Sequence, residues 1–428
     1  MSSEQNGSFY ALMPLFIFIF LFIGSGIITK DFYSMPINVA VIIASIVALS
    51  MNRKIKLNEK IKIYTKGAGH ENIVLMVFIF ILAGAFSEVA KGMGAVESTV
   101  NLGLSFLSPS LLMVGLFVIG CFLSITMGTS VGTVVALAPI GIAIAEQADI
   151  AMALAMATVV GGAMFGDNLS IISDTTIAAT KTQNTDMKDK FKTNFFIVLP
   201  GAILTAIILY FRTSPNVVTT EEYSWDIVKV LPYLIVLIVA LLGVNVFIVL
   251  IGGTLFAGIL GIIDGSYTIP TLFKAISNGI IEMQDIAIIS LLIGGLMAII
   301  QHNGGIQYLL YLLTKKIKSK KGAELGIAGL VSAADISTAN NTISIIVTGP
   351  LAKKIADKYE IEPRKSASIL DIFASSMQGL LPYGAQILAA AGLAAISPVA
   401  IMGYSIYPVL LGISGIIAIL IGYPKKRK

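Results

Sequence analysis

Residues 161–177 read Gly161-Gly-Ala-Met-Phe-Gly-Asp-Asn-Leu-Ser-Ile-Ile-Ser-Asp-Thr-Thr-Ile177, and the topology of the chain can be worked out around them. They place two carboxylates among hydroxyl and amide side chains, far from any flanking loop. A charge at bilayer depth costs at least about 2.5–3.5 kcal/mol, so these aspartates need a cation, a proton or a polar cavity. The many small residues also favour an interruption of the helix here.

The composition is that of a polytopic, all-α membrane protein. The 428 residues are 56% apolar and 12% charged, with a mean hydropathy of +0.90, whereas an average soluble domain is about 25% charged. Charge-free stretches such as 10–29, 73–87 and 194–211 have the length and hydropathy of membrane spans. We attribute the net charge of +5 to basic loops that fix orientation in the lipid bilayer, and expect no nucleic-acid partner.

Basic residues set the predicted orientation. Twenty-four of the 29 Lys and Arg residues fall in five clusters, at 53–66, 181–192, 315–321, 353–365 and 425–428. The positive-inside rule places these clusters in the cytoplasm. The chain then crosses the plasma membrane ten times, with both termini cytoplasmic. The predicted spans are 9–29, 35–51, 73–90, 151–180, 194–211, 229–243, 246–263, 284–301, 366–396 and 402–422.

Two further apolar segments, 111–147 and 325–356, are predicted to be re-entrant hairpins. Each has two arms of about 14 residues, which reach about 21 Å and cannot cross a hydrocarbon core of about 30 Å. Their tips, 124–130 and 335–342, are polar. Non-helical backbone at this depth is tolerated only against protein or a water-filled cavity.

The two halves of the chain repeat the same order of segments with opposite orientation. Glycines and prolines recur at a nearly fixed spacing: Gly84 with Gly294, Gly94 with Gly304, Pro139 with Pro350, and Gly166 with Gly379. We therefore predict a first repeat at 1–180, a linker with one span at 181–228, a second repeat at 229–396 and a C-terminal helix with a basic tail at 397–428. Each repeat ends in a broken helix, at 151–180 and 366–396. Inverted repeats with discontinuous helices are typical of secondary transporters.

The motif Gly166-Asp-Asn-Leu-Ser170, followed by Ser173-Asp-Thr-Thr176, resembles the G-D-x-x-S-P-x-S-D-T-T signature of NhaC-type sodium/proton antiporters, in the ion transporter superfamily. Ile171 stands where that family usually has proline. The resemblance implies a transport domain of hairpin tips and broken helices that moves as an elevator against a scaffold, and a homodimer. The wider superfamily also transports carboxylates and amino-acid-like solutes.

Hard oxygen donors gather at the hairpin tips and at the first broken helix, as a site for Na⁺ or for a proton on a carboxylate requires. We predict that Asp167 or Asp174 carries Na⁺ and H⁺ in competition, and that Asp335 and Asn340 complete the site. The Na⁺ ligands would be Asp167, Asn168, Asp174 and Asp335. The full set of predicted ion- or solute-binding residues is Thr126, Thr129, Ser130, Asp167, Asn168, Ser170, Ser173, Asp174, Thr175, Asp335, Ser337, Asn340, Asn341, Thr342 and Tyr383.

Three of these residues also have a purely structural interpretation. Asp167 could cap a half-helix while Ser170 stabilises the turn, and Asp335 could cap the second arm of its hairpin. Asp371, in the first arm of the second broken span, is interpreted as a polar structural contact. That broken span has Leu380 and Ile387 at the positions aligned with Asp167 and Asp174. Its polar groups include Gln378 and Gln386 in place of matching carboxylates.

The sequence favours a Na⁺/H⁺ antiporter that works by alternating access and needs no cofactor beyond its coupling ions. The main alternative is a Na⁺- or H⁺-coupled transporter or exchanger of a small carboxylate or amino acid. A passive channel is a third hypothesis. An intramembrane aspartyl enzyme is disfavoured, because seven residues of continuous helix would separate Asp167 from Asp174 by about 10 Å, whereas aspartyl chemistry needs two carboxylates that share a proton.

Overall fold

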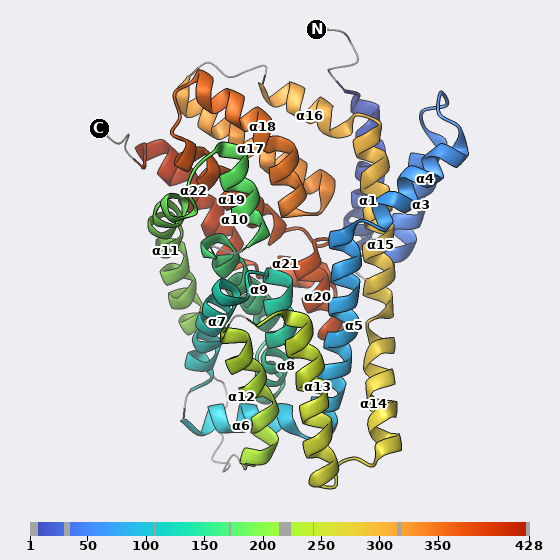
Figure 1. Cartoon of the computed structure of the whole chain (residues 1–428), viewed down its shortest axis with the longest axis vertical. Helices are drawn as coiled ribbons and strands as arrows, with labels where there is room; N and C mark the ends of the chain where they lie inside the picture. The colour runs from blue at the N-terminus through green and yellow to red at the C-terminus, as the bar shows by residue number, and fades with distance from the viewer. Residues whose placement is uncertain are drawn as a thin grey trace.

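The computed structural model describes residues 7–29, 35–106, 108–170, 173–213, 224–242, 244–314 and 319–424. Within these ranges the chain is helical and contains no strand (Figure 1). Six spans in the described part are long and apolar enough to cross a membrane, and shorter apolar helices accompany them. The chain is therefore a multi-pass membrane protein, which confirms the prediction from composition.

A group of long helices stands along one side of the bundle. α5 packs against α13, α14 and α15, and α15 also packs against α3 and α4 (Figure 1). The helices of the first 106 residues are α1 (Met13–Ile19), α2 (Ser25–Thr29), α3 (Ile37–Ser50), α4 (Leu57–Ala68), α5 (Glu71–Gly92) and α6 (Ala95–Phe106). The middle of the chain forms α11 (Met187–Arg212), α12 (Ile227–Leu241), α13 (Val246–Ile263), α14 (Ile269–Glu282), α15 (Gln284–His302) and α16 (Gly305–Thr314).

Two helix pairs cover the segments predicted as hairpins. They are α7 (Pro109–Met127) with α8 (Ser130–Gln147), and α17 (Lys320–Thr338) with α18 (Asn341–Lys358). At each tip one residue takes the left-handed conformation, Gly128 with φ +66° and Ala339 with φ +52°. The following residue is an N-cap: Thr129 accepts the N–H of Gly132, and Asn340 accepts that of Ile343. Left-handed C-caps and oxygen-bearing N-caps are what a tight turn between two helices requires.

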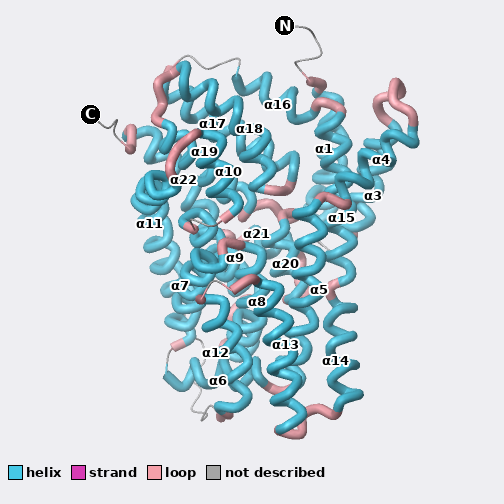
Figure 2. Tube along the Cα trace, in the orientation of Figure 1, coloured by secondary structure: helices cyan, strands magenta, loops and turns pink. Residues whose placement is uncertain are grey.

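Two other helices stop inside the bundle. α9 (Met152–Leu169) ends before α10 (Asp174–Gln183), and α19 (Pro363–Gln378) ends before α20 (Ala385–Leu393). Figure 2 shows loop segments in the interior of the molecule beside α9, α20 and α21 (Pro398–Met402), as well as at the two ends of the bundle. α22 (Ile406–Ile421) then packs against α11 and α19. Ile171, the departure from the family motif, lies outside the described residues.

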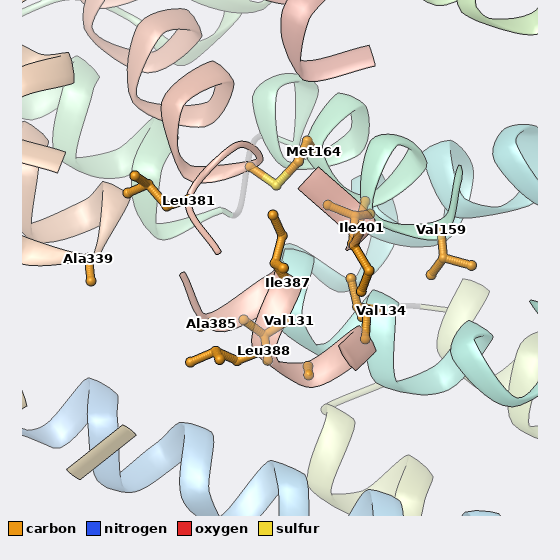
Figure 3. Packing of buried hydrophobic residues seen from close by; sticks show 14 of the residues in the cluster. Val131, Val134, Val159, Met164, Ala339, Leu381, Ala385, Ile387, Leu388 and Ile401 are labelled. Carbon is orange, nitrogen blue, oxygen red and sulfur yellow. The ribbon is translucent and has the colours of Figure 1, made fainter. Parts of the chain in front are cut away.

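Apolar packing holds the second interruption against the first hairpin. α20 contacts α8 and α9, and Figure 3 shows Ile387 and Leu388 of α20 beside Val131 and Val134 of α8. These four side chains are buried in the main apolar core. The segment after the break is therefore held by packing, and its position relative to the first tip is fixed.

Some helices were not anticipated from the sequence. Most of the basic segment 53–66 lies in the amphipathic helix α4, whose buried Lys60 donates to the carbonyl of Leu49 at 2.8 Å. α14, which precedes the predicted span 284–301, packs against α5. Its Gly279 meets Gly84 so closely that an added Cβ would lie 2.2 Å from the Gly84 carbonyl oxygen. Small residues allow such close approach of membrane helices.

Candidate functional site

A cavity of about 90 Å³ lies where the two hairpin tips meet the two interrupted helices. Its polar lining comes from four places in the sequence: the α7–α8 tip, the first interruption with the ends of α9 and α10 beside it, the α17–α18 tip and the second interruption. The polar residues around it are Thr129, Ser130, Asp167, Ser173, Asp174, Thr175, Asn340, Asn341, Thr342, Gln378 and Gln386. Most of the residues predicted from the sequence therefore converge on one place.

Asp167 is the buried carboxylate of this cavity, with only 3% of its surface exposed. Three donors from three helices point at it. The hydroxyl of Ser173, at the N-cap of α10, donates to Oδ1. Ser130 of α8 and Asn341 of α18 donate to Oδ2 at 3.2 and 3.3 Å. Such a set of donors stabilises the anion, and Asp167 does not cap α10, because the N-cap position belongs to Ser173.

Asp174 occupies a different environment. It is the first residue of α10 and is exposed, although it lines the same cavity. Thr175 beside it is buried and lies 2.8 Å from the Ser173 hydroxyl. The two aspartates of the motif are thus divided between the interior of the cavity and its accessible edge.

A chain of hydrogen bonds connects Asp167 to the second hairpin. Gln386 donates to the hydroxyl of Ser130 at 2.9 Å, and Gln378 donates to the side-chain oxygen of Gln386 at 2.9 Å. Gln378 also donates to the carbonyl of Ala339, at the α17–α18 tip, at 3.3 Å. A movement of one tip relative to the other therefore breaks hydrogen bonds in this chain.

A buried ion pair lies behind the site. Nζ of Lys190, in α11, is 2.5 Å from Oδ2 of Asp371, in α19. The same ammonium group donates to the carbonyl of Asn168 and to the hydroxyl of Thr176, both at 2.6 Å. Lys190 therefore satisfies a backbone carbonyl at the end of α9, where carbonyls lose their helical partners, and links it to a side chain in the first turn of α10.

Asn194 completes this network. Its amide donates to Asn168 and to Asp371, and its oxygen accepts from Ser368. The sequence did not single out Lys190 or Asn194. Lys190 had been counted with the cytoplasmic basic cluster, but α11 begins at Met187 and carries it into the buried interior. Asp371 could have pointed to Lys190, because a carboxylate within a membrane span needs a partner for its charge.

Several predicted residues lie outside the cavity lining. Asn168 faces the lysine network, and Ser170 donates to the carbonyl of Ile125 at 2.7 Å, consistent with a role in the turn. Ser337 donates to the carbonyl of Ala333, one turn earlier in α17, at 2.9 Å. The side chain of Thr126 is outside the described residues.

Asp335 and Tyr383 occupy the region behind the second tip. Asp335 is fully buried but does not line the cavity, and the cap of α18 is Asn340, so the capping interpretation of Asp335 was wrong. The hydroxyl of Tyr383 donates to the carbonyl of Ile336 at 2.9 Å.

Comparison with known proteins identifies the family. The sequence profile of the Na⁺/H⁺ antiporter family matches residues 7–212 and 217–425. The Na⁺/H⁺ antiporter NhaC of Bacillus subtilis (strain 168) is 26% identical, with all of both chains covered. NhaC of Alkalihalophilus pseudofirmus is 26% identical over 81% of each chain, and the malate-2H⁺/Na⁺-lactate antiporter of Bacillus subtilis is 21% identical over 86% of this chain and 85% of that protein. The resemblance seen in residues 166–176 is confirmed, and the chain belongs to the Na⁺/H⁺ antiporter family.

Proposed function

We propose that this chain is a secondary active transporter that exchanges Na⁺ for H⁺, with both ions competing for Asp167. The observation that carries this proposal is the environment of that carboxylate: it is buried, and hydroxyl and amide groups from three separate helices converge on it. Na⁺ and a proton each neutralise the same charge, so they cannot both be bound with full affinity.

The donor set suits both ions. A hydroxyl group donates to a bare carboxylate but can turn its oxygen toward a cation, and Ser130, Ser173 and Thr175 all carry hydroxyls at the cavity. The amide oxygen of Asn341 accepts the N–H of Thr342 at 3.0 Å and keeps a second lone pair, so a turn of the side chain would offer Na⁺ another hard ligand. Asp174, at the exposed edge, would attract the cation. We therefore propose a Na⁺ site at Asp167 with Ser173, Thr175 and Asn341, while Asn168 supports it through the lysine network.

An inverted repeat with an elevator movement is proposed for the architecture. Its support is a constant spacing between helix starts: α7, α8, α9 and α10 begin at 109, 130, 152 and 174, and α17, α18, α19 and α20 begin at 320, 341, 363 and 385, each 211 positions later. Pro139 and Pro350, inside α8 and α18, keep the same spacing. The proposed repeats at 1–180 and 229–396 would each supply one re-entrant hairpin and one broken helix, and alternate exposure of the site would follow from their movement against the remaining helices.

The basic clusters support a plasma-membrane location with cytoplasmic termini. α17 begins at the cluster 315–321 and α18 ends at the cluster 353–365, so the second hairpin would enter from the cytoplasmic side. The first would enter from the opposite side. A homodimer remains part of the proposal on family grounds.

Exchange of a small carboxylate is the second candidate, since one relative is the malate-2H⁺/Na⁺-lactate antiporter. The lining of the cavity favours an ion instead, because it offers no lysine or arginine to pair with a carboxylate solute.

The test is transport by the purified protein in liposomes that contain a pH dye. An inward sodium gradient should drive protons out in the absence of any organic solute, and Asp167→Asn should abolish this movement while Asp357→Asn, an exposed control on α18, leaves it intact. Proton movement that starts only when malate or lactate is added would favour the second candidate. Ion flux that never couples one gradient to the other would indicate a channel.

A further inference from the structure

Four carboxyl groups are buried in the described part of the chain: Asp167, Glu324, Asp335 and Asp371. Three of them have partners that stabilise the charged form. Asp167 accepts hydrogen bonds from three side chains, Lys365 lies 2.8 Å from Glu324, and Lys190 lies 2.5 Å from Asp371. Asp335 is fully buried and pairs with no cation, and the hydroxyl beside it, that of Ser344, donates its hydrogen to the carbonyl of Asn341 at 2.7 Å. A buried carboxylate without a cation or a committed donor is strongly disfavoured, so burial favours the neutral form of Asp335.

The neighbours of Asp335 follow from the register of α17 and α19. The ion pair of Glu324 with Lys365 joins their N-terminal ends, and the hydrogen bond from Gln378 to Ala339 joins their C-terminal ends. The two helices therefore run parallel with an offset of 39 to 41 positions, which sets Asp335 level with Ser375. The Ser375 hydroxyl and the side-chain oxygen of Gln378 are also buried without partners.

The buried oxygens without partners at this level of the two helices are those of Asp335, Ser375 and Gln378, hereafter the α17–α19 cluster, and the only hydrogen they can share is that of the Ser375 hydroxyl. Protonation of Asp335 supplies a second donor, because a neutral carboxyl group has an O–H to donate.

The surrounding charges are already engaged elsewhere. The Tyr383 hydroxyl donates to the Ile336 carbonyl, and Asp371, one turn before Ser375 on α19, is paired with Lys190. On the other helices that pack against α17, the charged groups are exposed or half-exposed: Asp285 and His302 of α15, and Lys353, Lys354, Asp357 and Lys358 of α18. None of these cations pairs with Asp335, so none of them competes with a proton for its carboxyl group.

We propose that Asp335 is a second proton-carrying carboxyl group, separate from the Na⁺ site at Asp167, so that each cycle exchanges two protons for one Na⁺. This inference rests on the Na⁺/H⁺ exchange proposed above. One proton competes with Na⁺ at Asp167, and the other is bound at Asp335 when the tip is packed as described and released when the tip opens to water. The hydrogen-bond chain Asp167–Ser130–Gln386–Gln378 leads from the first site to a member of the α17–α19 cluster, and through it opening of the second tip would alter the hydrogen bonds at Asp167. One net positive charge then crosses per cycle.

The test is the balance point of the two gradients in liposomes whose membrane voltage is clamped at zero with potassium and valinomycin. A tenfold sodium gradient is balanced by about half a pH unit if two protons move, and by about one pH unit if one proton moves. We expect about half a unit for the wild type and for Asp357→Asn, and about one unit for Asp335→Asn. A wild-type balance at one unit, or a variant that stays at half a unit, overturns the proposal. Absence of any balance point contradicts Na⁺/H⁺ exchange itself, which separates the two failures.

A second measurement covers the case in which Asp335→Asn is inactive. Infrared spectra of the purified wild type at neutral pH with saturating Na⁺, when Asp167 holds the cation, should still show the carbonyl stretch of a protonated buried carboxyl group. That band should shift in Asp335→Glu and disappear in Asp335→Asn. A wild type without the band overturns the proposal whatever the transport data.

Discussion

Lys190 of α11 and Asp371 of α19 form an ion pair of 2.5 Å whose two side chains are essentially inaccessible to solvent. The pair joins two helices that are far apart in the sequence, and through Asn168 and Thr176 it also holds the interruption between α9 and α10. Asp167 directly precedes Asn168, so the geometry of the site depends on this pair. Lys190 is a positioning residue, since it does not line the cavity.

Loss of one partner should therefore be more harmful than loss of both. Lys190→Met leaves Asp371 buried without its cation and should cost about 3–5 kcal/mol of stability, whereas Lys190→Met combined with Asp371→Leu should recover most of the loss. Lys192→Met, on an exposed position of the same helix, is the control. Thermal unfolding in detergent measures all four proteins, and a Lys190→Met protein as stable as the wild type would show that the pair holds nothing together.

The two aspartates of the motif should behave differently because only one is buried. Asp167→Asn should leave no exchange above that of empty liposomes. Asp174→Asn should keep exchange but raise the KM for Na⁺ about fivefold, the effect of about 1 kcal/mol of attraction at a solvated position. Initial rates at varied Na⁺ concentrations distinguish the two, and equal loss in both variants would disprove the division of roles.

Substitutions of two adjacent residues at the second tip should have different effects, one on the stability of the protein and the other on Na⁺ binding. Asn340 caps α18 by accepting the N–H of Ile343 at 2.9 Å, so Asn340→Ala should cost about 1 kcal/mol of stability and Asn340→Asp should restore it. Asn341 contacts Asp167 and is a proposed Na⁺ ligand, so Asn341→Ala should raise the KM for Na⁺ about tenfold, the effect of losing about 1.4 kcal/mol of Na⁺ binding. The outcome against this assignment is an Asn340→Asp protein with a raised KM and an Asn341→Ala protein without one.

Close contact between α7 and α9 places a steric limit on position 166. A Cβ added to Gly166 would lie 2.3 Å from Cβ of Ser124 and 2.5 Å from the carbonyl oxygen of Cys121. Gly166→Ala must separate the helices at the site and should destabilise the protein by about 1–3 kcal/mol or more. Gly115→Ala, on α7 with no atom within 4 Å of the added carbon, is the matched control and should not be destabilising. Equal melting temperatures for the two variants would exclude this steric limit.

The sequence was sufficient for the features that depend on composition and periodicity. Membrane spans, polar tips and the interruption near Asp167 could be predicted because a stranded charge and an apolar run have large, local energetic consequences. Neighbouring residues at a tip could not be told apart: Thr129 and Asn340 are caps, whereas Ser130 and Asn341 reach Asp167. Which of two neighbouring residues caps the helix and which contacts Asp167 depends on the direction of each side chain in the turn.

The features that were missed depend on contacts between distant segments. Lys190 belongs by sequence to a basic cytoplasmic cluster, and only the length of α11 brings it to Asp371. Likewise, the sequence placed Asp335 with the Na⁺ ligands, but the structure places it behind the tip with no partner. Which residues pair across two helices depends on how the helices pack, and the spacing of residues within one segment does not predict that packing.

Sodium binding to the purified protein as a function of pH tests competition at Asp167 most directly. Binding of ²²Na⁺ in detergent should weaken by up to tenfold for each unit of falling pH once the carboxyl group begins to protonate, because a single proton must leave for Na⁺ to bind. The same binding should be absent in Asp167→Asn and present in Asp357→Asn. A sodium affinity that does not change with pH, or that survives in Asp167→Asn, would contradict the account.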